Sequence, residues 1–301
     1  YEPDEFTFTA LAGTPVRELV ATLGAREQHL PFDPLWAEAG ATLGGTVAAG
    51  LSGPGRFRFG GLRDFILGVR FVDGDGRLLR MGGKVVKNAA GFDLPKFFSG
   101  SLGRFGALAE ITFKVFPRAA STRTLRLPAA DAAAITAILT AAANSRWELD
   151  ALEAAPEAGA VFARLAGPEP AFDPLAAEIF SRWPGTTLTS EEEAGLWRSV
   201  RAFGWAHPAG PLLKLALTPA QVPEFLAVCA ATAGACAWVG AGGNVGYLSL
   251  PVGAPPPRLV WPAMSLRGDA PLWPGVRPRF AIMQAVKTAL DPQHRFSGLD
   301  D

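Results

Sequence analysis

The stretch Gly82–Glu110 carries the residue types of this sequence that are best suited to hold a polar ligand. Its glycines stand at 82, 83, 91, 100, 103 and 106, and its polar side chains are Lys84, Lys87, Asn88 and Asp93. Glycine takes positive φ at no steric cost and lets the backbone approach a ligand. Glycine-rich turns also expose N–H groups that can cradle a phosphate or a polar ring. The alternative is a long surface loop whose glycines only make turns.

A second glycine-rich stretch, Gly40–Arg70, precedes the first one in the chain. Gly44-Gly45 comes before a small-residue helix start with Thr46 able to cap, and the free N–H groups of such a start suit an anionic or polar ligand. The glycine spacing does not match G-x-G-x-x-G, so a nicotinamide site is not indicated. Arg63-Asp64 in isolation is typical of a surface ion pair. The residues from Arg63 to Arg80 then predict a hairpin with a DGDG turn.

Histidine and cysteine, which often act as a catalytic base or a metal ligand, are sparse. The three histidines, His29, His207 and His294, show no paired spacing, so metal-assisted substrate binding is not expected. His207 is the one histidine that we consider as a weak candidate for a catalytic base, because histidine usually takes that role. Cys229 and Cys236 are the only cysteines and cannot hold an iron–sulfur cluster alone. We expect two reduced, mostly buried thiols.

The composition describes an ordinary globular chain without a strong charge. Its 301 residues are 49% hydrophobic, which allows two domains with ample core. The 28 basic and 28 acidic residues give no electrostatic case for nucleic acid. No run of eighteen apolar residues occurs, so no transmembrane segment is expected. We therefore expect a cytoplasmic protein that does not bind nucleic acid.

The glycine density falls and the alanine density rises after Pro117, which places a domain boundary at 118–121. The expected domains are 1–118 and 119–301. The second domain reads as two similar units, each a strand, a helix and two strands. The predicted elements are strand 122–128, helix 130–143, strands near 148–155 and 159–166 and a helix near 172–182, then strand 211–218, helix 220–232 and strands 235–239 and 243–250. This repeat is consistent with a ferredoxin-like α+β domain.

Three further segments complete the second domain. Between the two units, Ser190 and Glu193 predict a capping box at the start of a helix. The proline-rich segment 251–278 is expected to be irregular. A helix over 278–290, which Asp291-Pro292 stops, is expected to return to the first domain.

Two sequence blocks resemble a known family. KNAAGFDLPKFFSGSLGRFGALAEITFKV is similar to the block that closes the FAD-binding domain of the vanillyl-alcohol-oxidase (PCMH-type) flavoproteins. Together with GATLGGTVAAGLSGPGRFRFGGLRDFILGVR, it most closely resembles the E-type FAD-binding subunits of bacterial glycolate oxidase or dehydrogenase. The resemblance covers about residues 1–118. It implies an α+β fold, with a PCMH-type FAD-binding domain that is partial at its amino terminus followed by a ferredoxin-like α+β cap domain.

The resemblance implies FAD as the cofactor. Neither block contains a histidine or a cysteine, so we expect the FAD to be non-covalent. A main-chain group of Leu108 is expected to read the adenine edge. The residues that match the family's cofactor-binding blocks are Gly40, Ala41, Thr42, Gly44, Gly45, Thr46, Ser52, Gly53, Gly60, Arg63, Asp64, Lys84, Asn88, Gly91, Phe92, Asp93, Gly103, Leu108 and Glu110. The family's usual ending, L-D-P-x-x-x-F-N-P-G-R, is changed here to Phe296-Ser297-Gly298, which puts a ring contact from this end in doubt.

Three hypotheses on function follow from these observations. In the first, the chain is the FAD-binding subunit of a glycolate dehydrogenase complex. Its partners are a catalytic flavoprotein subunit and an iron–sulfur subunit, and a small 2-hydroxy acid is its indirect substrate. Any association with the inner membrane is made through those partners. In the second, it is a self-sufficient FAD oxidoreductase for a 2-hydroxy acid, which the lack of a histidine cluster disfavours. In the third, it is a non-catalytic scaffold that has lost tight FAD binding.

Overall fold

The computed structural model describes residues 1–84, 94–277 and 280–300. Its contacts divide the chain into two compact units. The first unit comprises Tyr1–Arg56, Gly60–Arg118 and Arg279–Asp301, and the second comprises Phe57–Phe59 and Ala119–Pro278. The C-terminal helix α8 (Phe280–Leu290) therefore belongs to the first unit, although 160 residues of the second unit precede it in the chain.

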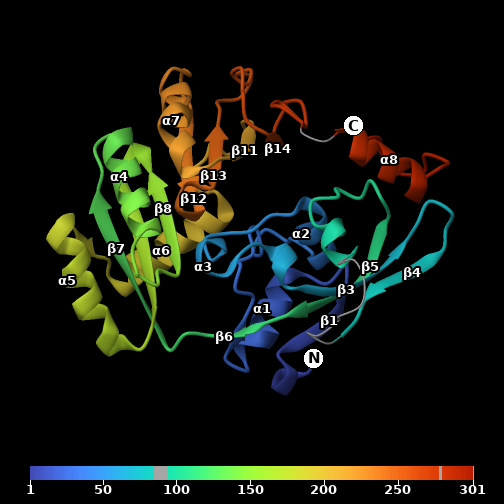
Figure 1. Ribbon diagram of the computed structural model, residues 1–301, viewed down its shortest axis with the longest axis horizontal. Helices are drawn as coiled ribbons and strands as arrows, with labels where there is room; N and C mark the ends of the chain where they lie inside the picture. Colours follow the sequence, from blue (N-terminus) through green and yellow to red (C-terminus); the bar gives the residue numbers. More distant parts are fainter. Residues whose placement is uncertain (85–93, 278–279, 301) are drawn as a thin grey trace. The chain divides into compact units, whose positions relative to one another are not determined.

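A four-stranded antiparallel sheet forms the centre of the first unit (Figure 1). Its order is β1 (Thr7–Leu11), β5 (Ala107–Lys114), β3 (Ile66–Val72) and β4 (Leu78–Gly82). The predicted DGDG hairpin joins β3 to β4. It closes because the carboxylate Oδ1 of Asp73 accepts hydrogen bonds from the backbone N–H groups of Asp75 and Arg77, at 3.0 and 2.9 Å.

Phenylalanine rings fill the core beside this sheet. Phe113 of β5 stacks on Phe8 of β1 with 5.8 Å between ring centroids, and Phe32 lies 6.0 Å from Phe113. The remaining elements of this unit are short: η1 (Pro3–Glu5), α1 (Val16–Gly24), β2 (Gln28–His29), α2 (Leu43–Ala49), η2 (Leu62–Asp64), η3 (Leu94–Phe98) and β6 (Phe116–Pro117). The short helix α3 (Arg56–Phe59) begins where the first unit's chain passes into the second.

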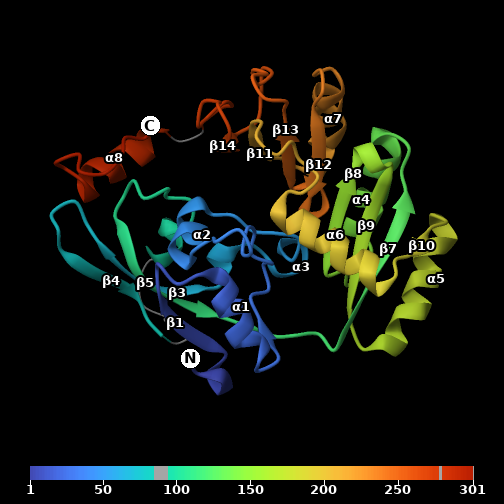
Figure 2. The same ribbon diagram turned by 180° about the vertical axis from the view of Figure 1, so that it is seen from behind.

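The second unit is built on one eight-stranded sheet (Figure 2). Its order is β10-β7-β9-β8-β12-β13-β11-β14, and every neighbouring pair is antiparallel. The strands are β7 (Ser121–Pro128), β8 (Ala151–Ala155), β9 (Ala160–Gly167), β10 (Thr186–Thr187), β11 (Leu212–Ala216), β12 (Cys236–Gly240), β13 (Val245–Ser249) and β14 (Ala263–Arg267). Short helices η4 (Pro156–Ala158), η5 (Glu169–Ala171), η6 (Pro219–Gln221) and η7 (Ala241–Gly243) connect them.

The expected strand–helix–strand–strand repeat is present. β7, α4 (Ala132–Ala143), β8 and β9 form the first copy, and β11, α7 (Val222–Ala230), β12 and β13 form the second. In each copy the last strand inserts between the first two, which is the split β-α-β arrangement of ferredoxin-like folds. The two copies meet where β8 pairs with β12, at Ala154 opposite Val239.

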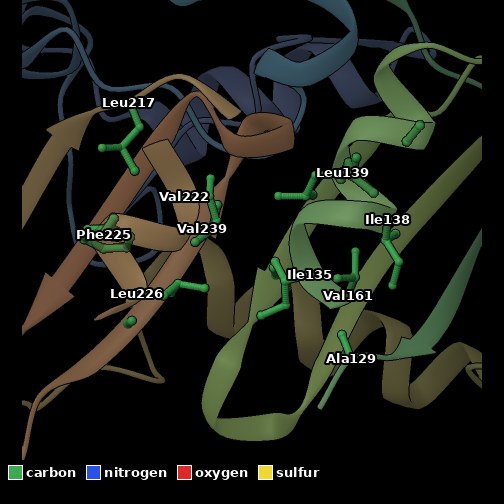
Figure 3. Close-up of a cluster of buried hydrophobic side chains, with 14 of the residues drawn as sticks. Ala129, Ile135, Ile138, Leu139, Val161, Leu217, Val222, Phe225, Leu226 and Val239 are labelled. Carbon is green, nitrogen blue, oxygen red and sulfur yellow. The ribbon is translucent and has the colours of Figure 1, made fainter. Parts of the chain in front are cut away.

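The main core of the second unit lies between the sheet and helices α4 and α7. Figure 3 shows Ile135, Ile138 and Leu139 of α4 and Val222 and Phe225 of α7 directed toward the strands. Helix α5 (Phe172–Arg182) contributes to the same core, whereas α6 (Ser190–Ala202) covers the opposite face. Figures 1 and 2, which view the unit from opposite sides, show α4 in front in one and α6 in front in the other.

Three local predictions are wrong. The capping box of α6 is formed by Thr189 and Glu192 instead of Ser190 and Glu193, because the helix begins one residue earlier than expected. The pair Thr14-Pro15 predicts an N-cap at Thr14 followed by proline at the first helical position, but the N-cap position of α1 is occupied by Pro15 without a side-chain bond. The proline-rich segment after residue 250 is not irregular throughout, since it contains β14 at the sheet edge.

Candidate functional site

The structure brings the two glycine-rich stretches of the first unit together at the C-terminal half of α2. The backbone N–H of Gly100 donates to the carbonyl of Val47 at 3.0 Å, and that of Leu102 donates to Ala48 at 2.8 Å. Gly50 ends α2 with a φ of 62°, and a Cβ there would lie 2.8 Å from the Gly100 nitrogen. A side chain at Gly50 would therefore push the two stretches apart.

The start of α2 differs from the expectation. The helix begins at Leu43, so that Gly44 and Gly45 lie inside its first turn, and Thr42 replaces Thr46 as the cap. Thr42 Oγ1 accepts from the N–H of Gly45 at 3.2 Å. The N–H groups of Leu43 and Gly44 donate to the carbonyls of Thr14 and Ala12 at 2.9 and 2.7 Å. The chain itself thus satisfies these three donors, and the free helix N-terminus that we expected is not present.

The adjacent glycines 44 and 45 have different surroundings. A Cβ at Gly44 would lie 2.7 Å from the Ala12 Cβ, so this glycine is required for packing against the residue after β1. A Cβ at Gly45 would meet only Thr42 Oγ1, at 3.1 Å, and the residue is exposed. Gly40 and Gly103, with φ of 90° and 75°, have no atom within 4 Å of an added Cβ. A Cβ at Gly40 or Gly103 would therefore meet open space, whereas a Cβ at Gly45 would press on the Thr42 hydroxyl.

Two buried hydroxyls in these stretches support a polar ligand. Thr46 Oγ1 and Ser101 Oγ have no hydrogen-bond partner among the described residues, although Thr46 is only 7% exposed and Ser101 only 3%. A buried polar atom without a partner costs free energy, and such atoms are commonly satisfied by a ligand or by water. Thr46 lies in α2 and Ser101 in the loop bonded to α2. These residues fit a cofactor with hydrogen-bonding groups, such as FAD.

The rest of the earlier stretch is held by internal bonds. Ser52 Oγ accepts from the N–H of Leu62, and Asp64 Oδ2 accepts from the N–H of Gly61, both at 2.9 Å. Of the other expected residues here, Ala41 is half-buried and Arg63 is exposed. Gly53 is buried, and a Cβ there would lie 2.1 Å from the carbonyl oxygen of Asp33. Gly60 has a φ of 88°. Ser52, Gly53 and Asp64 thus shape the loop.

The later stretch is described only in part. Lys84 is exposed just after β4, and Glu110 of β5 forms an ion pair with Arg70 of β3 at 3.8 Å. Leu108 lies on β5 opposite Phe71, beyond the end of β1, whose register stops at Leu11 opposite Glu110. The expected contacts of Asn88, Gly91, Phe92 and Asp93 lie outside the described residues.

His207 lies in the second unit, where its ring is engaged by neighbouring groups. Its Nε2 lies 2.7 Å from the Gly234 carbonyl and 3.6 Å from Cys236 Sγ. Both cysteines are free, as expected. Burial, together with the charge of Glu157, raises the pKa of Cys236 and raises that of Cys229 to about 12. A thiol with a raised pKa is a poor nucleophile near neutral pH, so the geometry does not support a Cys–His nucleophile.

The sheet face under α6 carries buried charges that sequence reasoning missed. Arg164 of β9 donates to Asp150 and lies 4.6 Å from the centroid of the Trp197 ring. Glu153 of β8 accepts from Trp238 Nε1 at 2.6 Å and from the Ala241 N–H at 2.9 Å. Arg164 and Glu153 lie on strands among apolar residues, so only the alternation of the strands could have placed them on this face.

Metal-binding clusters and membrane-spanning helices are both absent from the described residues. Across 1–84, 94–277 and 280–300, no cluster of three or more His, Cys, Asp or Glu side chains is arranged to hold a metal ion. Within the same ranges no helix combines the length and the hydropathy that crossing a bilayer requires. The site described above is therefore one of glycines, hydroxyls and backbone groups.

Comparisons with known proteins indicate an FAD-binding domain in the first part of the chain. Residues 1–82 match a family model described as an FAD binding domain. The chain is 46% identical over 126 residues to the glycolate oxidase subunit GlcE of Escherichia coli strain K12, a match that covers 42% of this chain and 36% of that protein. It is 28% identical over 124 residues to the glycolate oxidase subunit GlcD of Bacillus subtilis strain 168, covering 41% and 26%. The match thus spans only 36% of the first relative's length and 26% of the second's.

Solved structures extend the likeness of fold over the whole chain. An alkyldihydroxyacetonephosphate synthase matches with a TM-score of 0.67 at 13% identity, covering 97% of this chain and 64% of that one. A BBE-like 1 variant of Physcomitrella patens matches with a TM-score of 0.65 at 14% identity, covering 99% and 77%. At such low identity these matches show the fold alone, and together with the family model they confirm the expected α+β fold class.

Proposed function

Because this chain carries an FAD-binding domain of the PCMH-type flavoproteins, we propose that it is the FAD-binding subunit of a glycolate dehydrogenase complex. In this proposal it holds the flavin for electron transfer with a catalytic flavoprotein subunit and an iron–sulfur subunit. The observation that carries the proposal is the 46% identity to a glycolate oxidase subunit, combined with the meeting of the two glycine-rich stretches at Gly50 and Gly100.

The bound FAD would supply the redox chemistry, and the chain would supply position and surroundings. Gly103 would let the backbone approach the cofactor, since no atom lies within 4 Å of an added Cβ. Gly45 would do so because it is exposed and carries no side chain of its own. The hydroxyls of Thr46 and Ser101 would gain the hydrogen-bond partner that they lack. A main-chain group of Leu108 would contact the adenine edge. Neither stretch offers a histidine or cysteine for attachment, so the FAD would be held without a covalent bond.

The second unit's chemistry favours an electron-transfer role over direct substrate oxidation. A 2-hydroxy acid needs a cation for its carboxylate and a base for its hydroxyl proton, and general-base assistance typically contributes about 10²–10⁴-fold. Arg164 is already paired with Asp150 and stacked on Trp197, so a substrate carboxylate would have to displace Asp150. His207 is engaged by Gly234 and Cys236. These contacts support the subunit hypothesis over the self-sufficient oxidoreductase.

Two measurements on the purified chain test the proposal. The visible spectrum should show oxidised flavin bands near about 370 and 450 nm, and the flavin should appear in the supernatant after denaturation. A chain that binds no flavin when loaded with FAD would favour the scaffold hypothesis, and flavin that stays with the precipitate would contradict the non-covalent assignment. In stopped-flow experiments, neither glycolate nor D-lactate should reduce the loaded chain alone. Bleaching within seconds would instead favour the self-sufficient oxidoreductase.

A further inference from the structure

The C-terminal segment is fastened to the first unit through a buried lysine. Lys287 of α8 is only 2% exposed, and its ammonium donates to three oxygens. These are the Asp291 Oδ2 at 2.6 Å, the Arg104 carbonyl at 2.7 Å and the Phe296 carbonyl at 3.1 Å. A buried charge is tolerated only when it is paired and hydrogen-bonded. All three N–H donors of this ammonium are used. The lysine can make these bonds only when α8, the residues after it and Arg104 are all in place.

Further bonds order the residues that follow α8. Asp291 is fully buried, and its carboxylate accepts from the backbone N–H groups of Arg295 and Phe296 at 2.8 and 3.0 Å. The guanidinium Nε of Arg104 donates to the Gly298 carbonyl at 2.7 Å. Leu299 is buried at 5% exposure, although it stands two residues from the end of the chain. The segment Lys287–Leu299, which we call the C-terminal clamp, is therefore a packed part of the first unit.

The β3–β4 hairpin holds the same helix from a second point. The N–H of Gly74 donates to the Leu290 carbonyl at 3.0 Å. A Cβ at Gly74 would lie 2.6 Å from Asp291 Oδ1 and 2.7 Å from its Cα. In Figure 2 the end of α8 lies beside this hairpin. The hairpin glycine thus permits a close approach that any larger residue would block.

The loop that the clamp contacts also forms part of the candidate flavin site. Residues 100–106 include Gly103, which leaves space beside it, and Ser101, whose hydroxyl has no partner among the described residues. The same loop is bonded to α2 through Gly100 and Leu102 and to the clamp through Arg104. Its conformation is therefore set jointly by α2 and by residues about 190 positions later in the chain.

We propose that the C-terminal clamp positions the 100–106 loop for FAD, so that cofactor binding and docking of residues 287–299 strengthen each other. The inference rests on the proposed function, and Lys287 acts in it as a positioning residue that does not touch the cofactor. Coupling between two binding events is reciprocal. FAD should therefore protect the clamp from opening, and loosening the clamp should weaken FAD binding by the same factor.

The test uses Lys287→Met in the full chain, with Thr288→Ala as the matched control. Thr288 is exposed on the same helix and bonds only the Gln284 carbonyl. Trypsin cleavage after Arg295, an exposed residue inside the clamp, is followed by mass spectrometry with and without FAD. FAD affinity is measured by titrating flavin fluorescence. Arg104→Ala serves as a milder second variant, because it removes the bond to Gly298 but keeps the Arg104 carbonyl that Lys287 needs.

We expect FAD to slow cleavage of the unsubstituted chain and of Thr288→Ala. Lys287→Met should be cleaved faster without FAD and should bind FAD about tenfold more weakly, within the usual range of coupling between sites. Arg104→Ala should change both quantities in the same direction by less. Tryptophan fluorescence reports folding of the second unit, which holds every tryptophan except Trp36.

Three results would overturn the inference, and they are distinguishable. Full FAD affinity in Lys287→Met together with faster cleavage would show that the clamp opens without affecting the cofactor, so the coupling would be wrong while the proposed function stood. Failure of the unsubstituted chain to bind FAD at all would overturn the proposed function and the coupling with it. A Lys287→Met chain that aggregates leaves the decision to Arg104→Ala, whose unchanged affinity and cleavage would also contradict the inference.

Discussion

In the first unit the buried hydroxyls of Thr46 and Ser101 have no partner among the described residues, whereas in the second unit the buried charges Glu153, Asp150 and Arg164 are bonded within the chain. Both sets are almost fully buried. The contrast separates polar groups that the fold has already satisfied from groups that a ligand can still satisfy. In the proposed function the ligand binds at α2 and the 100–106 loop, and the charges on the sheet face under α6 have a structural role.

The largest expected effect is the loss of flavin from Gly45→Val. The added side chain would enter the space beside α2 and exclude the cofactor. The fold should be retained, because a Cβ at this exposed position meets only Thr42 Oγ1 and valine is a better helix former than glycine. Flavin content is read from the absorbance near about 450 nm, with Gly45→Ala as the smaller control. Full occupancy in Gly45→Val would show that the open space is not the cofactor site.

A substitution at the sheet face of the second unit should lower stability but leave flavin binding unchanged. Arg164→Met leaves the Asp150 carboxylate buried without its partner, which should lower the free energy of unfolding by about 3–5 kcal/mol. Urea unfolding followed by tryptophan fluorescence measures this, since seven of the eight tryptophans lie in the second unit. Flavin content should be unchanged at low urea. Arg146→Met is the control, because Arg146 forms an exposed ion pair with Glu178 and should cost less than about 1 kcal/mol. Equal costs for the two variants would contradict the structural role.

The acid stability of the first unit should depend on Asp291. Burial alone would raise the pKa of this carboxyl, but the hydrogen bonds from Lys287 and from the N–H groups of Phe296 and Arg295 outweigh burial and lower the pKa to about 2, from an ordinary value of 3.8. A group whose pKa is lower in the folded state stabilises the protein above its unfolded pKa. This contribution should be present above pH 3.8 and be lost as the pH falls toward about 2.

The acid prediction is measured by trypsin cleavage after Arg295. The protein is exposed briefly to acid and is then returned to neutral pH in the presence of the protease. Asp291→Asn should be cleaved readily already at neutral pH and should lose the acid dependence. An acid profile for Asp291→Asn that matches the unsubstituted chain would show that other carboxyls control opening. Acid cleavage confined to the first unit's C-terminal segment would sharpen the contrast between the units.

The sequence predicted the elements and their order better than their local contacts. Alternation and helical spacing indicated the repeat of the second unit, because those patterns depend on which residues face the core. The capping box was displaced because Thr189 and Ser190 are each followed three residues later by a glutamate, and only the start of the helix decides between them. β14 was missed because the prolines around it outweighed its short strand pattern.

The site was predictable as a region but not residue by residue. Glycine density marked α2 and the 100–106 loop, yet nothing in the sequence distinguishes Gly44, which packs on Ala12, from Gly45, which is exposed. That difference arises from the tertiary contact of α2 with the residue after β1. The Lys287 contact with Arg104 joins residues 183 positions apart, so it leaves no local sequence signal. The difference between the two glycines and the Lys287 contact both arise from tertiary packing of segments that are distant in the sequence.

The smallest expected effect comes from Thr46→Val. It tests the comparison most directly, because the substitution should not destabilise the FAD-free first unit but should weaken the binding of FAD. Thr46→Val replaces a buried hydroxyl that has no partner among the described residues by a methyl of similar size. Without FAD this should leave the free energy of unfolding unchanged or raise it slightly, since an unsatisfied buried group is removed. With FAD the lost hydrogen bond should cost about 0.5–1.5 kcal/mol, which raises the dissociation constant by roughly two- to tenfold. Thermal unfolding of the two forms with and without FAD measures both effects. Destabilisation of Thr46→Val without FAD would show that the hydroxyl has a structural partner after all. Unchanged FAD binding would remove the hydroxyl from the cofactor site.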